Sequence, residues 1–163
     1  MGRGTTPRRL EETGLAQDRK GASDARVSLD GAPDEGARPV ASPASLAHQI
    51  GDLILDNKGL GLTVISVEPV TTLCDYIVLA TATSARQVHA LARDIMEFAK
   101  ASKKKVLSCE GLEQGWWVLI DLGEVIVHVM QPEAREYYDL ENIWADGRVV
   151  RRVEDPDQSF LTT

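Results

Sequence analysis

Hydrophobic and polar positions along the chain repeat with two periods, one typical of helices and one of strands. The first helical stretch begins at Ser42-Pro43, an N-cap residue followed by proline, and ends at Lys58-Gly59. A second begins at Ser84, which forms the S-x-x-Q pattern of a capping box with Gln87, and runs to about residue 102. Apolar residues three and four positions apart give each stretch one apolar face. We therefore predict two helices that pack against a sheet.

Five further stretches have the β-branched, apolar pattern of strands. Residues 75–82 are apolar enough to favour a central position in the sheet, because both faces of a central strand are covered. The last two strands are joined tightly at Leu122-Gly123, which predicts a hairpin. The predicted strands are residues 62–67, 75–82, 106–110, 116–122 and 124–130.

A final helical stretch follows Gln131-Pro132, where the strand pattern stops, and it contains Tyr137 and Tyr138. The order of elements is α-β-β-α-β-β-β-α. This order predicts an α/β fold with a mixed five-stranded sheet flanked by helices. We place the domain at residues 41–148 and predict a flexible C-terminal tail at residues 149–163.

The predicted hairpin has one apolar face and one mixed face. With a two-residue loop, Trp117 opposes His128 and Asp121 opposes Glu124, whereas a three-residue loop puts Trp116 beside His128. The sequence leaves both registers open. In the first register the apolar face consists of Trp116, Val118, Ile120, Val125, Val127 and Val129. The mixed face consists of Trp117, Leu119, Ile126, His128 and Met130, edged by Asp121 and Glu124, and such a face suits a protein partner.

Composition places the chain among soluble globular proteins, with 43% hydrophobic and 26% charged residues. No apolar run approaches the ~20 residues that span a bilayer, so we expect no membrane partner. The N-terminus shows no apolar segment typical of a secretory signal. Cys74 and Cys109 do not form a C-x-x-C pair, which favours two buried thiols in a reducing compartment.

Charge is unevenly distributed between the two parts of the chain. Residues 1–40 contain seven basic and seven acidic residues, so the net charge of −7 belongs to residues 41–163. This first segment is rich in Gly, Pro and Ser and poor in apolar residues, which predicts a disordered tail. A targeting segment or a misassigned start codon is the alternative, although transit peptides are poor in acidic residues. The acidic body disfavours direct nucleic-acid binding and favours a basic protein surface as partner.

Several side chains invite a catalytic interpretation. Asp121 and Glu124 flank the hairpin turn and resemble paired acid/base groups or metal ligands. His48 and His89 lie on separate predicted helices without metal-ligand spacing. We interpret the two carboxylates as solvated turn residues and His128 as a packed or interface histidine. We therefore predict no catalytic residue, no metal site and no cofactor.

Three segments carry a resemblance to a known family. They are DYIVLATATSARQVHALA at 75–92, CEG at 109–111 and WVLIDLGEVIVHVMQPEAREYYDLENIW at 117–144. Over roughly residues 46–146 they resemble the Iojap family of ribosomal silencing factors (RsfS). The chain departs from the family pattern at Ala82, where many relatives have glycine, and at Trp116, an extra aromatic residue.

The resemblance implies a nucleotidyltransferase-like fold without known transferase activity. It also implies docking on ribosomal protein L-fourteen, at the face of the large subunit where the small subunit joins. Joining is then blocked sterically and translation repressed when nutrients are scarce. We expect this repression of translation to take place in a bacterial cytoplasm rather than in an organelle matrix. The expected partner-binding residues are the anchors Trp117, Arg135 and Tyr138, the acidic rim Asp121, Glu124 and Glu141, and His128 in the surface or its support.

One alternative function and one assembly state of the free protein accompany this interpretation. The first is an active metal-dependent nucleotidyltransferase, which needs a D-x-[DE] pair to hold two metal ions on the substrate phosphates. Thr83-Ser84 occupies the expected turn, but no such pair occurs in residues 106–110 or 116–122. The second is a homodimer of the free protein, in which a second copy covers the face that the ribosome would use.

Overall fold

The computed structural model describes residues 42–155. The predicted tail at residues 1–40 and the last part of the predicted C-terminal tail, residues 156–163, lie outside the described residues. Both predicted helices are present, as α2 (Pro43–Asp56) and α3 (Ala85–Ala101). Their caps are formed, because the Ser42 hydroxyl accepts from the Ser45 N–H and the Ser84 hydroxyl accepts from the Gln87 N–H, each at 3.1 Å.

The sheet is mixed and has six strands in the order β3-β4-β5-β2-β1-β6. β2 and β5 run parallel, and every other neighbouring pair is antiparallel. The mixed α/β architecture is confirmed, and the strand at 75–82 is central as predicted. The strands are β1 (Leu60–Ser66), β2 (Tyr76–Thr81), β3 (Ser108–Glu110), β4 (Trp117–Asp121), β5 (Val125–Met130) and β6 (Arg148–Val153).

The predicted count of five strands is wrong, because β6 adds an edge strand beside β1. The predicted tail at 149–163 is accordingly wrong over residues 149–153, which belong to this strand. Its sequence, RVVRRV, carries no regular apolar alternation, since an edge strand buries little of its surface. Its position is decided by pairing with β1 and by Arg151, whose guanidinium contacts Asp52 at 2.8 Å.

The β4–β5 hairpin is present, but its register differs from the prediction by two residues. Leu119 opposes His128 and Trp117 opposes Met130, around a two-residue loop of Gly123 and Glu124. Gly123 has φ +89°, a conformation that glycine adopts without steric cost, and this fixes the loop one residue later than predicted. A slip of two residues keeps every side chain on its predicted face, because the side-chain period of a strand is two.

One member of the predicted apolar face is misplaced. Trp116 precedes β4 and is 40% exposed, so it is not a core residue. The remaining members, Val118, Ile120, Val125, Val127 and Val129, are fully buried.

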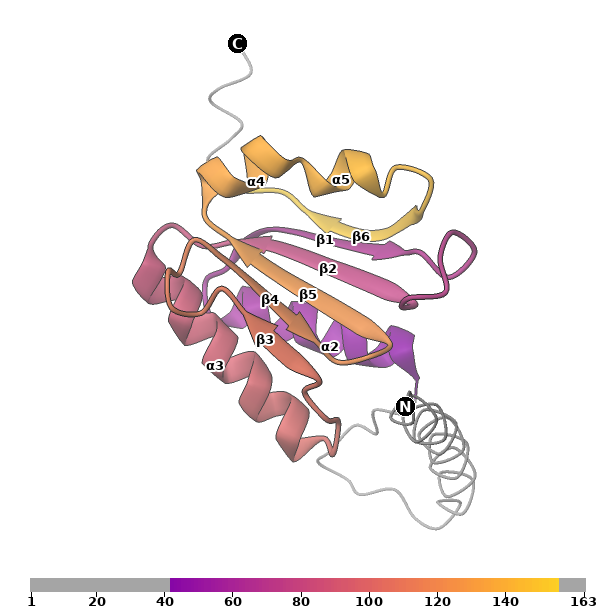
Figure 1. Cartoon of the computed structure of the whole chain (residues 1–163), viewed down its shortest axis with the longest axis horizontal. Helices are drawn as coiled ribbons and strands as arrows, with labels where there is room; N and C mark the ends of the chain where they lie inside the picture. Colours follow the sequence, from indigo (N-terminus) through magenta and orange to yellow (C-terminus); the bar gives the residue numbers. More distant parts are fainter. Residues whose placement is uncertain (1–41, 156–163) are drawn as a thin grey trace, which may run out of the picture. The chain divides into compact units, whose positions relative to one another are not determined.

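The two faces of the sheet are covered by different helices (Figure 1). α2 and α3 pack on the face that carries the buried valines, whereas α4 (Pro132–Tyr138) and α5 (Leu140–Ile143) lie on the opposite side of the sheet. The predicted final helical stretch is divided into α4 and α5 at Asp139, whose left-handed backbone conformation, with φ +47°, interrupts the helix. Within residues 42–155 no helix has the length and apolar character needed to cross a bilayer.

A second apolar cluster fills the space between the sheet and the last two helices. Ala134 is the buried residue of α4 and Leu140 that of α5. The cluster consists of Ile65, Val67, Cys74, Ile77, Leu79, Met130, Ala134 and Leu140, with Trp117, Ile126 and Trp144 packed against it. The mixed face of the hairpin is thus largely covered from within the chain.

Candidate functional site

Three aromatic side chains form an exposed surface at the beginning of β4 and on α4, which we call the aromatic surface. Tyr137 is 75% exposed, Trp116 40% and Tyr138 37%. Their rings meet edge to face, with centroids 5.8 Å apart for Trp116 and Tyr138 and 4.9 Å apart for Tyr137 and Tyr138. The three exposed rings therefore form a connected aromatic patch, and such patches mark sites of protein interaction.

Acidic side chains border this surface. Glu133 and Glu136 line a shallow hollow together with Trp116 and Tyr137. Both glutamates lie on α4 and are exposed. Aromatic rings beside carboxylates suit a basic partner, since a Lys or Arg side chain can stack on the rings while its charge faces the carboxylates.

Trp117 lies beneath the aromatic surface. Its ring centroid is 4.5 Å from that of Tyr138, and its indole N–H donates to Nδ1 of His128 at 3.0 Å. His128 is 6% exposed, and burial lowers its pKa to about 4, so the ring is neutral at pH 7. Because Nδ1 accepts, the proton of this neutral imidazole sits on Nε2. Both residues support the surface from below.

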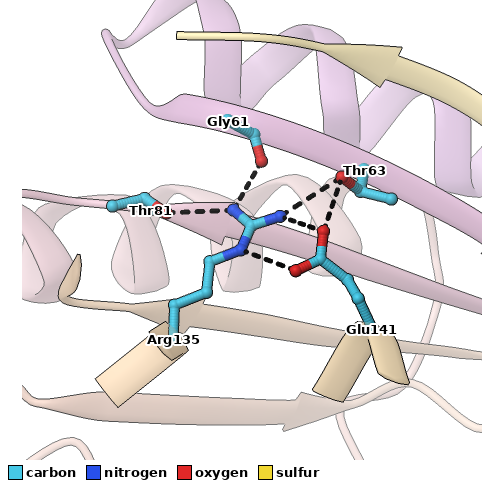
Figure 2. Close-up of polar contacts among 5 residues, drawn as sticks. All are labelled: Gly61, Thr63, Thr81, Arg135 and Glu141. Carbon is cyan, nitrogen blue, oxygen red and sulfur yellow. Dashed lines mark hydrogen bonds and ion pairs between the residues drawn. The ribbon is translucent and has the colours of Figure 1, made fainter. Parts of the chain in front are cut away.

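Arg135 and Glu141 form a separate network with three residues of the sheet, which we call the arginine clamp (Figure 2). The Arg135 guanidinium contacts Glu141 through Nε–Oε1 at 3.4 Å and Nη2–Oε2 at 2.9 Å. It also donates to the Thr63 hydroxyl at 3.2 Å, the Thr81 hydroxyl at 2.9 Å and the Gly61 carbonyl. The clamp joins α4 and α5 to β1 and β2.

The clamp keeps Glu141 ionised. Burial raises the pKa of this carboxyl, but the hydrogen bonds and the positive charge of Arg135 outweigh burial and lower the pKa below its usual value. The Arg135 side chain is 15% exposed and that of Glu141 is 32% exposed, so both charges are largely turned into the molecule.

Asp121 and Glu124 lie at the turn of the hairpin and are held by neighbours. The Asp121 carboxylate accepts from the Gly123 N–H at 2.8 Å, and the Glu124 carboxylate lies 3.7 Å from Nζ of Lys104. The region described by the structure holds no group of three or more His, Cys, Asp or Glu side chains that could bind a metal ion. Trp117 and Asp121 stand at opposite ends of β4, four residues apart. At the usual rise of ~3.3 Å per residue, the turn lies about 13 Å from Trp117.

The seven predicted site residues thus fall into three groups. Trp117, His128 and Tyr138 come together, Arg135 and Glu141 form the clamp, and Asp121 and Glu124 lie at the hairpin turn. Sequence reasoning missed Trp116 and Tyr137 as the most exposed members of the aromatic surface, and Glu133 and Glu136 as its acidic border. The helical positions of residues 133, 136 and 137 on one side of α4 were the available signal.

Comparison with known families shows which family the chain belongs to. The family described as "Ribosomal silencing factor during starvation" matches residues 40–161. The chain belongs to this family. Among its members, the ribosomal silencing factor RsfS of Zymomonas mobilis is 35% identical over 105 residues, which cover 64% of this chain and 79% of that protein.

The solved structures agree with this family assignment. A crystal structure of a Chromobacterium violaceum protein is 35% identical, with a TM-score of 0.62 over 64% of this chain and 87% of that chain. A more distant relative of the silencing factors is the mouse protein named "Mitochondrial assembly of ribosomal large subunit protein 1". It is 32% identical over 95 residues, which cover 56% of this chain and 42% of that protein.

Proposed function

We propose that this chain is a ribosomal silencing factor that binds the large ribosomal subunit and represses translation when nutrients are limiting. It docks on ribosomal protein L-fourteen and occupies the face where the small subunit joins, so the block is steric and stoichiometric. The proposed place of action is the bacterial cytoplasm, because the silencing factors that this chain resembles include those of bacteria such as Zymomonas mobilis and Bacillus subtilis.

The observation that carries this proposal is the aromatic surface with its acidic border. A stable complex buries roughly 800 Å² on each partner, and a few aromatic or arginine side chains supply most of the binding energy. Trp116, Tyr137 and Tyr138 supply such anchors, and Glu133 and Glu136 supply the charge that selects a basic protein.

The other predicted contacts take different roles in this proposal. Trp117 and His128 support the aromatic surface from beneath, because both are buried or partly buried and bonded to each other. Arg135 and Glu141 hold α4 and α5 on the sheet. Asp121 and Glu124 lie at the hairpin turn and form, at most, a distant edge of the interface.

The alternative function is a metal-dependent nucleotidyltransferase, and the nucleotidyltransferase-like description of the fold stays a prediction. The contacts of Asp121 and Glu124 argue for turn stability, since one carboxylate caps the loop and the other meets Lys104. Binding to large subunits that is unchanged by added nucleotide favours the silencing factor over the enzyme.

Cosedimentation of the purified chain with separated ribosomal subunits tests the proposal. We expect the protein to pellet with large subunits and not with small subunits. Tyr137→Ala should weaken this binding by about 30-fold or more, the usual cost of losing an interface anchor, while the melting temperature changes little because Tyr137 is 75% exposed. Leu73→Ala is the matched control, because Leu73 is also 75% exposed but lies in the loop between β1 and β2.

Two results would contradict the proposal. If Tyr137→Ala and Leu73→Ala bind equally well, the docking surface lies elsewhere on the molecule. If the chain binds naked ribosomal RNA tightly in a gel shift with a steep salt dependence, the protein-docking mechanism is wrong, because an acidic protein is repelled by phosphates. A free homodimer that buries the same surface would appear as a concentration-dependent mass in sedimentation velocity.

A further inference from the structure

The arginine clamp uses every donor of its guanidinium. An arginine side chain carries five N–H groups in a rigid, planar fork. In this structure they meet both carboxylate oxygens of Glu141, the hydroxyls of Thr63 and Thr81, and the carbonyl of Gly61. With no donor left over, the guanidinium is committed to contacts inside the chain.

The first strand is shaped to receive this guanidinium. The β1–β2 register is interrupted by a bulge between Leu60 and Thr63, and Gly61 within it has φ +54°. A bulge turns a backbone carbonyl away from its strand partner, and here the Gly61 carbonyl meets Arg135. A Cβ at Gly61 would lie 3.1 Å from Nη1 of Arg135, so a side chain there would crowd the guanidinium.

The elements that the clamp holds have little other anchorage. α4 has seven residues and α5 has four, and each buries a single residue, Ala134 and Leu140. Helices this short do not persist in water without tertiary contacts. Arg135 lies in the middle of α4, and Tyr137 and Tyr138 follow it within the same turn. A shift of α4 after loss of the guanidinium contacts would therefore move both tyrosines.

We propose that Arg135 is a positioning residue, which holds α4 at one place on the sheet so that Tyr137 and Tyr138 stay packed beside Trp116 in a surface ready to bind. This inference rests on the proposed function for its ribosomal consequence. Without the clamp, α4 samples other positions, and only the fraction of molecules with the correct arrangement binds. Apparent affinity then falls in proportion to that fraction.

Thr63→Val is the sharpest test. Thr63 is 2% exposed and lies on β1 beneath the helices, so it is unable to touch a partner directly. Valine keeps the shape but removes the acceptor for Arg135 and the donor to Glu141. We expect about tenfold weaker binding to large subunits, with altered near-ultraviolet circular dichroism from the rearranged aromatic rings. Ser66→Ala is the control, since Ser66 is also buried on β1 but on its other face.

Substitution of the arginine itself completes the series. Arg135→Met should weaken binding more than Thr63→Val, and Arg135→Lys should restore part of the loss because an ammonium still reaches some of the acceptors. If Arg135→Met does not fold, Thr63→Val decides the question. In a double variant with Tyr137→Ala and Arg135→Met, the loss of binding free energy should be smaller than the sum of the losses in the two single variants. The reason is that both substitutions act on the same surface.

The outcomes separate this inference from the proposed function. If Arg135→Met and Thr63→Val both keep wild-type affinity and aromatic ellipticity while Tyr137→Ala loses affinity, the positioning role is wrong and the function stands. If the wild-type chain does not bind large subunits, the function fails, and the near-ultraviolet spectra still decide whether the clamp orders the aromatic rings. Unchanged spectra in both clamp variants overturn the inference.

Discussion

Trp116 and Trp117 are adjacent in the chain, but the structure gives them opposite roles, and alanine substitution separates the two. Trp117 packs against the cluster between the sheet and α4, and its indole N–H is the donor to buried His128. Truncating a buried aromatic residue costs about 3–5 kcal/mol of unfolding free energy. For Trp117 the cost should be about 3 kcal/mol, because its ring is only partly buried. Leaving the His128 acceptor without a donor adds about 1 kcal/mol.

The expected loss for Trp117→Ala is therefore about 4 kcal/mol of unfolding free energy. For a domain of this size, each kcal/mol corresponds to roughly 4 °C, so the melting temperature should fall by about 15 °C. Trp116 is 40% exposed and makes an edge contact with Tyr138, worth about 0.5–1 kcal/mol. Trp116→Ala should lower the melting temperature by no more than ~5 °C while weakening large-subunit binding.

Thermal denaturation followed by circular dichroism at 222 nm measures the first effect, and cosedimentation measures the second. Trp117→Phe is the control that isolates the hydrogen bond, because it keeps an aromatic ring and removes the N–H; it should cost about 1–2 kcal/mol. A larger loss of stability in Trp116→Ala than in Trp117→Ala would refute the reasoning, since it would make Trp116 the packed residue.

Two further predictions concern stability alone. Burial lowers the pKa of His128 from the ordinary value of 6.5 to about 4 in the folded protein. Between these two pH values the unfolded chain binds a proton at His128 that the folded chain does not bind. The free energy of unfolding should therefore fall as the pH drops from 6.5 toward 4. Urea denaturation at several pH values should show a flatter profile for His128→Asn, and an equal slope in both proteins would contradict the burial argument. Gly111→Ala should destabilise by several kcal/mol more than Gly123→Ala, because both glycines have positive φ but only at Gly111 would a Cβ lie 2.0 Å from the Trp117 carbonyl oxygen. Equal urea midpoints for the two variants would show that the loop moves to accommodate the methyl group.

Local patterns in the sequence determined much of the fold. The caps at Ser42 and Ser84 were predictable because each depends on a hydroxyl and a backbone N–H three residues away. The two faces of the hairpin were predictable because side chains alternate along a strand, and this alternation survives the two-residue error in register. The long motif at residues 117–144 indicated the family, which the match over residues 40–161 confirms.

Contacts between distant parts of the chain were decided only by the tertiary structure. β6 has no apolar alternation of its own, and its place comes from pairing with β1 about 85 residues earlier. The sequence alone predicts Arg135 to be an exposed anchor on a helix. In the structure, however, its hydrogen-bond acceptors include Thr81 and Thr63, which lie 54 and 72 residues away along the chain. Which tryptophan faces solvent depends on where β4 begins and on how α4 crosses the sheet. Neither property is encoded in local spacing, because both follow from packing of segments that the chain brings together only when it folds.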